Sequence, residues 1–245
     1  MRPFITTAGL LLGWELLVLL SSLPVYILPP PSSVAIVMVE RFGLLVGEAA
    51  WTAGEMVLGL LLGLLLGASL AIALAASAAW RRWALPVVIV SQAIPVIAIA
   101  PLLVVWLGYG MASKVAMAAL VIFFPVASAL YDGLRRTDPG WLDLARTMEA
   151  SPHAVLLQIR LPAALPAFAS GARIAAAVAP IGAVIGEWVG ASAGLGFLMT
   201  QSLARGQTPL AFAALVVLCL LGLALYYATD WIGRRLVPWQ PSQGD

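Results

Sequence analysis

The sequence predicts an all-α protein that crosses a membrane about six times. Of its 245 residues, 62% are hydrophobic and only 10% are charged, and the mean hydropathy is +1.03. About a quarter of the residues of an ordinary soluble domain are charged, so the composition excludes a soluble enzyme. The charge-free runs 16–39, 56–80 and 206–229 are each long enough for a helix to cross the hydrocarbon core, which takes roughly 20 residues.

The spans are predicted in chain order, one on each apolar run. The first, at 5–27, resembles a signal peptide, but it is long, carries Glu15 and ends in three prolines without a small-residue cleavage site. We therefore expect a retained helix. The other spans are predicted at 51–77, 84–107, 112–131, 166–189 and 210–232, and the whole chain, 1–245, is expected to be one domain.

Two of these spans carry residues that predict how they pack. Gly59, Gly63 and Gly67 lie four residues apart in the second span, a spacing that lets another helix approach closely. We expect this contact within the subunit rather than between two copies. Gln92, Pro95 and Pro101 interrupt the third span and predict a kink. That helix either lines a translocation pathway or only packs with a bend.

The distribution of basic residues predicts the orientation. With the N-terminus inside, ten basic residues fall on the cytoplasmic side and three, Arg41, Lys114 and Arg205, fall outside. Positive residues concentrate on the cytoplasmic side of membrane proteins, so both termini are expected in the cytoplasm.

The same composition excludes several kinds of chemistry. A single cysteine, Cys219, and a single histidine, His153, cannot form a Cys/His metal site or a disulfide framework. Lys114, the only lysine, is not in a glycine-rich phosphate loop. The basic residues are scattered among spans and form no nucleic-acid surface. We therefore expect no metal, cofactor or nucleic acid, and any ATP-driven role would need a separate ATPase subunit.

The segment 132–165 is expected to be a folded cytoplasmic loop, because long unstructured loops are rare. Asp138-Pro139 predicts a helix start, after which Trp141, Leu144, Ala145 and Met148 form one apolar stripe. Ser151-Pro152 predicts a second short helix to about Arg160, stopped by Pro162 and Pro166. Two amphipathic helices at a membrane face either tether two spans or dock a soluble partner, and their periodicity favours neither.

This loop resembles the signature of binding-protein-dependent ABC importer permeases, which reads E-A-A, three residues, G, nine residues, I-x-L-P. Asp143 takes the Glu position, and Glu149 takes the Gly position. In the family this loop couples the permease to its ATPase, so the resemblance implies a coupling role for Asp143, Ala145, Met148, Glu149, Ala150, Ile159, Leu161 and Pro162. Glu149 adds a charge where the family usually bends the chain, which affects the turn geometry.

The resemblance also implies a type I importer permease fold and a set of partners. These are two ATPase subunits, a second permease copy in a homodimer, an extracytoplasmic binding protein and the lipid bilayer of a bacterial inner membrane. The segments 91–95 and 186–191 are similar to permeases attributed to uptake of thiamine's pyrimidine precursors, such as hydroxymethylpyrimidine. More broadly, the third and fifth spans look like permeases for sulfonates, taurine or nitrate.

Charged residues inside spans are costly, so each acid there suggests a function. Glu187, near the outer end of the fifth span, either belongs to an outer gate or pathway or is a structural acid bonded to nearby backbone. Glu55 in the second span has the same two interpretations. Together with Gln92, Pro95 and Pro101 they are the predicted pathway residues.

Two other functions remain as alternatives. An ion-coupled secondary transporter would place paired ionisable residues near the midplane, often in matched repeats. An intramembrane enzyme would need a nucleophile, base or metal constellation within the spans. The acids here lie toward span ends, and the chain has one histidine and one cysteine, so both alternatives are disfavoured.

Overall fold

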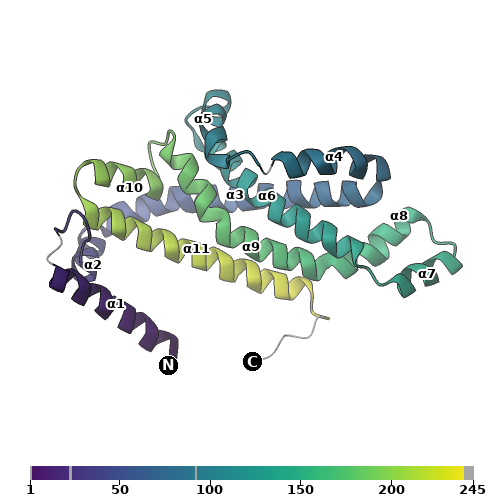
Figure 1. The fold of residues 1–245 in the computed structure, drawn as a ribbon, viewed down its shortest axis with the longest axis horizontal. Helices are drawn as coiled ribbons and strands as arrows, with labels where there is room; N and C mark the ends of the chain where they lie inside the picture. The colour runs from purple at the N-terminus through teal and green to yellow at the C-terminus, as the bar shows by residue number, and fades with distance from the viewer. Residues whose placement is uncertain (1, 22–23, 92, 240–245) are drawn as a thin grey trace.

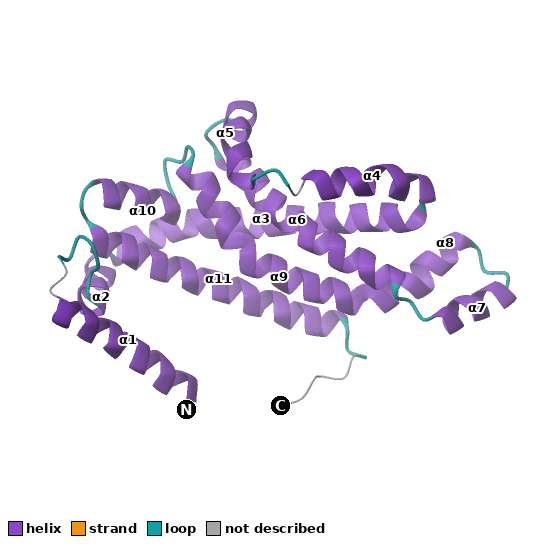
Figure 2. Cartoon of the chain, in the orientation of Figure 1, coloured by secondary structure: helices purple, strands orange, loops and turns teal. Residues whose placement is uncertain are grey.

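The computed structural model describes residues 2–21, 24–91 and 93–239, and all regular secondary structure within these ranges is helical (Figures 1 and 2). This confirms the predicted all-α class. The first half of the chain forms α1 (Arg2–Ser21), α2 (Pro31–Glu40), α3 (Phe42–Ala76), α4 (Ala78–Ser91), α5 (Val96–Leu107) and α6 (Met111–Arg135). The second half forms α7 (Pro139–Thr147), α8 (Pro152–Ala154), the π-helical turn η1 (Val155–Arg160), α9 (Leu161–Trp188), α10 (Leu195–Ala204) and α11 (Thr208–Leu236).

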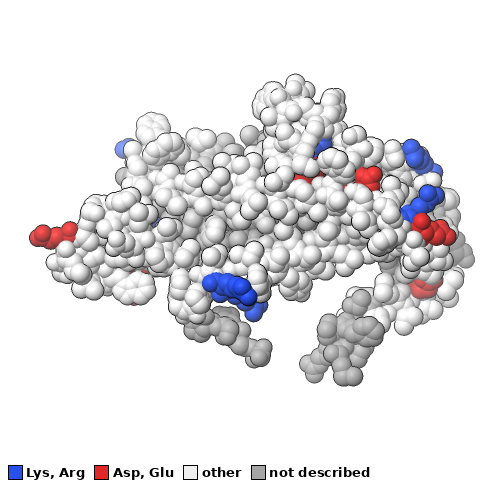
Figure 3. Space-filling model, turned by 180° about the vertical axis from the view of Figure 1, so that it is seen from behind, with Lys and Arg blue, Asp and Glu red and all other residues white. Residues whose placement is uncertain are grey.

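Four helical segments in the described ranges are long and apolar enough to cross a membrane. These are α3, α6, the 37-residue segment Pro152–Trp188 and α11. They run along the long axis of the molecule, with α2 and α10 at one end and α7 and α8 at the other (Figure 1). The face in Figure 3 has wide uncharged areas, interrupted by a basic patch at its lower edge and by charged residues toward both ends. This arrangement suits a bundle with its long axis across a bilayer.

The core of the bundle forms where α3, α6 and α9 meet. Leu60 of α3, Ile122 of α6 and Ala179 of α9 belong to one buried cluster. Small residues on α9 let α6 approach: a Cβ added at Gly182 would lie 2.6 Å from the Cα of Ala118. The helices are therefore held by close packing of backbones, which replaces the hydrophobic driving force that is missing inside lipid.

The glycine spacing in the second predicted span serves this packing. Gly59, Gly63 and Gly67 all face α6, and a Cβ added at Gly63 would lie 2.5 Å from the Cγ2 of Ile122. Real Cβ atoms do not approach other atoms so closely. The prediction of a contact within the subunit is confirmed.

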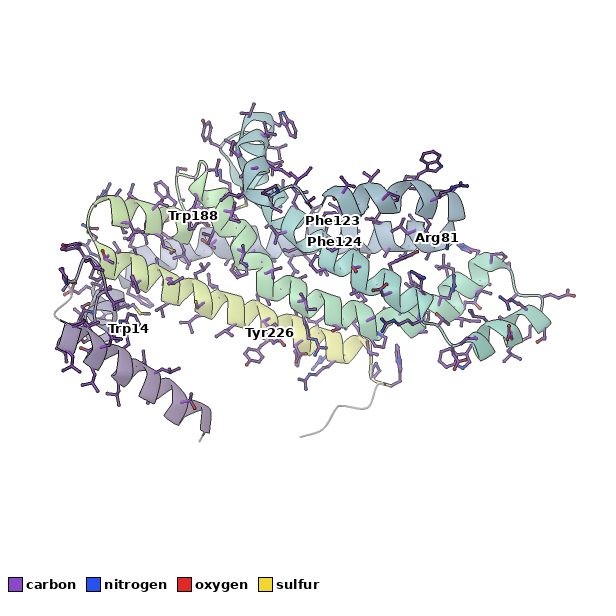
Figure 4. The ribbon with its side chains drawn as sticks, in the orientation of Figure 1. Trp14, Arg81, Phe123, Phe124, Trp188 and Tyr226 are labelled. Carbon is purple, nitrogen blue, oxygen red and sulfur yellow. The ribbon has the colours of Figure 1, made fainter. Side chains whose placement is uncertain are left out.

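The first predicted span, 5–27, is shorter in the structure. Helix α1 ends at Ser21, and α2 begins separately at Pro31. Trp14 of α1 (Figure 4) packs near Phe212 of α11, with ring centroids 5.7 Å apart. Helix α2 begins at the last of the three consecutive prolines 29–31, because proline donates no backbone hydrogen bond and begins a helix more readily than it continues one.

The prediction of one kinked third span at 84–107 was wrong. The chain forms two helices there, α4 and α5, each too short to cross a membrane alone. Pro95 lies at the boundary as the residue before α5. A proline disfavours the α conformation of the residue before it, and Ile94, the residue before Pro95, lies between the two helices. Helix α5 projects from the bundle (Figure 1), and its Val105 and Trp106 are 78% and 69% exposed.

The predicted stop between the second loop helix and the fifth span was also wrong. The structure runs without interruption from Pro152 through η1 to Trp188, although Pro162 and Pro166 lie in this stretch. A proline removes one hydrogen-bond donor, and a π-helical turn shifts the pairing to i→i+5. The π turn η1 ends at Arg160, two residues before Pro162, so the shifted pairing lies next to this proline. The non-helical part of the 132–165 loop is correspondingly short.

Candidate functional site

Helices α7 and α8 form a hairpin, and each begins with the N-cap that the sequence predicts. The Asp138 carboxylate accepts a hydrogen bond of 2.7 Å from the Gly140 amide, and the Ser151 hydroxyl accepts one of 3.2 Å from the Ala154 amide. Pro139 and Pro152 each occupy the first turn, where a missing donor costs nothing. These short-range signals fix where both helices start.

The end of α7 is set by a turn that usually requires glycine. Glu149 has φ +53°, in the left-handed region, and it is the one non-glycine residue in the described ranges with positive φ. The Ala150 amide donates to the Ala145 carbonyl at 3.0 Å, and the Glu149 amide donates to the Arg146 carbonyl at 3.0 Å. This pair of bonds defines a Schellman motif. The family's glycine position is thus a left-handed helix cap, here occupied by glutamate.

An apolar groove lies between α7 and the start of α9. It has a volume of about 380 Å³. Trp141, Leu144 and Met148 are 54%, 61% and 72% exposed. We call this surface the hairpin groove, and its lining residues are Trp141, Leu144, Ala145, Met148, Gln158, Ile159, Pro162, Ala163 and Trp239.

The predicted coupling residues divide between the groove and its supports. Ala145, Met148, Ile159 and Pro162 line the groove, with Ala145 buried beneath α7. The others support it: Asp143 forms a 2.6 Å ion pair with Arg146, Leu161 packs against the core, and Glu149 and Ala150 form the turn. Trp239 was not predicted, because a tryptophan in a terminal segment has no periodic pattern around it.

A second site, which is polar, lies at the opposite end of the bundle. We call it the α10 polar cluster and define it as Glu48, Thr52, Glu55, Lys114 and Glu187. The Glu187 carboxylate accepts hydrogen bonds from the Gly196 amide at 2.5 Å, the Phe197 amide at 3.2 Å and the Thr52 hydroxyl at 2.7 Å. Trp188, next to it, marks the end of α9 that approaches α10 (Figure 4). The cluster therefore joins α9 to the first turn of α10.

Helix α3 supplies the rest of this junction. The Thr52 hydroxyl accepts a 2.8 Å bond from the Leu195 amide, and the Glu48 carboxylate accepts a 2.5 Å bond from the Gly194 amide. Four consecutive amides at the start of α10 are thus bonded to side chains of other helices.

Lys114 and Glu55 complete the cluster. The Lys114 ammonium donates 2.6 Å bonds to the carbonyls of Tyr109 and Gly190, which lie in the connections before α6 and after α9. The Glu55 carboxyl group lies beside Glu187 and Lys114, and its Oε2 atom is buried without a hydrogen-bond partner. Acid and base thus face each other inside the subunit.

The predicted pathway residues do not form one site within the chain. Glu187 and Glu55 are only 1% and 3% exposed, so both carboxyl groups face the interior of the subunit. Pro95, just before α5, and Pro101, within α5, are both exposed. Gln92 lies outside the described residues. Glu48, Thr52 and Lys114 were not predicted, because only the tertiary structure brings them to Glu187.

A smaller ionic network joins α9 and α11. The Asp230 carboxylate pairs with Arg173 at 3.0 Å and with Arg234 at 2.8 Å. Arg235 lies over the ring of Trp231 at 3.8 Å from its centroid. Asp230 is almost buried, so this network ties the two helices together.

Comparisons with known proteins agree with this arrangement. Residues 59–239 match the family described as binding-protein-dependent transport system inner membrane component. The chain is 51% identical over 97% of its length to a probable ABC transporter permease protein of Haemophilus influenzae, 97% of which is covered.

Two further relatives carry names that include a solute. The riboflavin transport system permease protein RibX of Chloroflexus aurantiacus is 41% identical over 97% of the chain and 90% of its own length. The formylaminopyrimidine transport permease protein ThiX of Halalkalibacterium halodurans is 40% identical over 64% of the chain and 63% of its own length.

Solved structures show the same fold. An inward-facing structure of the MetNI methionine ABC transporter superposes with a TM-score of 0.70 at 22% identity, over 80% of this chain and 98% of the other. At this identity the likeness concerns the fold alone.

Proposed function

We propose a function from the premise that this chain belongs to the family of binding-protein-dependent transport system inner membrane components. It imports a small heteroaromatic solute, with the help of an ATPase docked on its hairpin groove. The chain is a permease subunit of an ABC importer and a multi-pass membrane protein. The proposal concerns its solute, its partners and the residues that couple it to ATP hydrolysis.

The coupling proposal rests on one observation, the exposed apolar stripe of α7. Trp141, Leu144 and Met148 project from a short capped helix beside an apolar groove, and such side chains in water favour a partner that covers them. The signature resemblance favours the ATPase subunit as that partner. Two permease copies and two ATPase subunits would then form the importer, and closure of the ATPase pair would draw the two hairpins together.

Charge-introducing variants of α7 test this coupling. In Leu144→Arg and Met148→Arg, an exposed apolar side chain becomes a cation, so the hairpin keeps its fold but loses the apolar contact. Thr147→Arg is the matched control, because Thr147 is exposed on the same helix and lies outside the groove. We expect the ATPase to co-purify with the control and with wild type, and to be lost from the two groove variants. Equal capture by all four proteins would contradict the coupling role.

The proposed solute is a pyrimidine precursor of thiamine, such as hydroxymethylpyrimidine. The segments 91–95 and 186–191 support it, as does the 40% identity to a formylaminopyrimidine permease. Riboflavin is the second candidate, because the riboflavin permease matches 97% of the chain at 41% identity. Sulfonate permeases are less similar, at 28% identity over 99% of the chain.

Uptake by the assembled importer distinguishes these solutes. Vesicles that contain the permease, its ATPase and its binding protein should accumulate labelled hydroxymethylpyrimidine when ATP is present, and should ignore taurine. Riboflavin uptake without pyrimidine uptake would transfer the assignment to the second candidate.

The proposed orientation places both termini and the hairpin groove in the cytoplasm. The ten-to-three distribution of basic residues supports it. The α10 polar cluster, at the opposite end of the bundle from the groove, would then lie near the outer surface, on the side from which a binding protein delivers the solute.

A further inference from the structure

The first turn of α10 is held entirely by side chains from elsewhere in the chain. The first amides of any helix lack partners within the helix, and a side chain at the N-cap usually accepts from one of them. Here the N-cap is Gly194, which has no side chain to contribute. Glu48 and Thr52 of α3 and Glu187 of α9 bond the amides of residues 194 to 197 instead.

The backbone of this turn is shaped around the Glu187 carboxylate. Gly194 has φ +111°, which side-chain-bearing residues rarely adopt, and a Cβ there would overlap the carboxylate. A Cβ at Gly196 would lie 2.8 Å from Glu187 Oε2. Both glycines are buried, so water cannot replace the lost bonds, and leaving the amides without partners would be costly. The position of α10 therefore depends on the positions of α3 and α9.

Helix α9 connects this cluster to the hairpin groove. The helical segment from Pro152 to Trp188 has 37 residues, which corresponds to roughly 55 Å at 1.5 Å per residue. Ile159 and Pro162, near its start, line the groove, and Glu187, near its end, holds α10. A tilt of α9 imposed at the groove would displace Glu187, and the hydrogen bonds would carry α10 with it.

We propose that Glu48, Thr52 and Glu187 are positioning residues that fix α10 to α3 and α9, so that α10 moves with these helices and relays binding-protein docking to the ATPase. This inference rests on the proposed function for its role in transport. Lys114 supports the same junction, because its bonds to Tyr109 and Gly190 fix the connections on either side.

The test compares variants that remove or keep the Thr52 hydroxyl. Thr52→Val keeps the shape and removes the hydrogen bonds of the hydroxyl with the Glu187 carboxylate and the Leu195 amide, whereas Thr52→Ser keeps the hydroxyl. Thr229→Val is the matched control, because the Thr229 hydroxyl bonds only the Leu225 carbonyl of its own helix. Each permease is assembled with its ATPase in lipid nanodiscs, and ATP hydrolysis is measured with and without solute-loaded binding protein.

We expect Thr52→Val to reduce the stimulation of ATP hydrolysis by the binding protein about fivefold or more, the range typical of coupling between sites. Basal hydrolysis should stay within about twofold of wild type, and Thr52→Ser and Thr229→Val should behave like wild type. A purely structural defect would lower basal and stimulated rates together. An unchanged stimulation ratio in Thr52→Val would overturn the relay.

Hydrogen exchange on the permease alone tests the anchoring without any partner. In Thr52→Val and Glu187→Ala, the amides of residues 194–197 should exchange about tenfold or more faster than in wild type, which corresponds to about 1.4 kcal/mol of lost protection. Unchanged exchange would overturn the role of these side chains. If the wild-type complex shows no stimulated hydrolysis, the proposed importer function fails, and the exchange measurement still decides whether the network holds α10.

Discussion

Glu149 shows how a single residue departs from a family pattern without losing the structure that the pattern encodes. The backbone of this chain turns into the left-handed region after α7, where glycine is the usual residue, and Glu149 adopts φ +53° there. A residue with a Cβ is strained in this region by roughly 1 kcal/mol. The two hydrogen bonds of the Schellman motif hold it in place.

Replacing Glu149 by glycine should therefore stabilise the permease. We expect Glu149→Gly to gain about 0.5–1 kcal/mol, since glycine adopts positive φ freely but loses more chain entropy on folding. Thermal unfolding of the detergent-solubilised protein should shift upward by about 1–4 °C. Glu149→Ala is the control, because it removes the charge and keeps the strained Cβ. An equal upward shift for alanine would assign the effect to charge.

Asp230 takes part in an ion pair between two helices, and the coupling within this pair can be measured. It accepts from Arg173 across helices and is largely shielded from solvent, whereas the Asp143–Arg146 pair is exposed on both sides. A double-mutant cycle of Arg173→Ala and Asp230→Ala should give a coupling free energy of about 1 kcal/mol, measured as thermal stability. The same cycle on Asp143 and Arg146 should give about 0.5 kcal/mol or less, because solvent screens that pair. Equal values would show that the α9–α11 pair is also screened.

At the scale of elements, the packing of α3 on α6 depends on the absence of side chains. Gly59, Gly63 and Gly67 sit where an added Cβ would enter the volume of α6. The same helix also contains Gly54, whose added Cβ would meet only the end of the flexible Met111 side chain at 3.5 Å. The two positions provide a matched pair within one helix.

Gly63→Ala should destabilise the bundle, and Gly54→Ala should not. Overpacking of a tight contact costs about 1–3 kcal/mol, which would lower the unfolding temperature of the permease by several degrees, about 2–4 °C per kcal/mol. Alanine also has a higher helix propensity than glycine, so Gly54→Ala should be neutral or slightly stabilising. The comparison is made by thermal unfolding in detergent. Equal shifts at both positions would mean that α3 can move away from α6.

At the scale of the whole molecule, the bundle has two distinct ends. The hairpin groove lies at one end and the α10 polar cluster at the other, joined by α9 (Figure 1). The proposed side of the membrane for each end rests on the distribution of basic residues. Arg136 lies just after α6 on the proposed cytoplasmic side, and Arg205 lies just after α10 on the proposed outer side.

Cysteine labelling in intact cells tests this orientation. Because Cys219 is the only cysteine, Cys219→Ser gives a background without thiols. In that background Arg205→Cys should react with a membrane-impermeant maleimide, and Arg136→Cys should react only after the cells are opened; both native side chains are exposed. The opposite pattern would invert the proposed topology and place the groove outside.

Much of this architecture could be predicted from the sequence, because bilayer thickness and local capping act over short distances along the chain. Apolar run length identified the long helices, Asp138-Pro139 and Ser151-Pro152 identified the hairpin starts, and the glycine spacing identified the α3–α6 contact. The prolines were interpreted less well: Pro95 separates two helices, whereas Pro162 and Pro166 lie within one. Whether a proline ends a helix depends on what its surroundings offer the freed carbonyl groups, and the sequence does not show those surroundings.

The tertiary structure alone decided the partners of the buried charges. Glu187 was recognisable as an unusual acid in an apolar segment, but Thr52 lies 135 residues away from it along the chain and Glu48 lies 146 residues away from its partner Gly194. Such hydrogen bonds form because burial leaves polar groups no water to bond, so the fold must bring partners together from distant segments. The sequence by itself therefore determined the all-helical class, the long apolar helices and the starts of the hairpin helices, and the packing of those helices determined which side chains meet and what they hold in place.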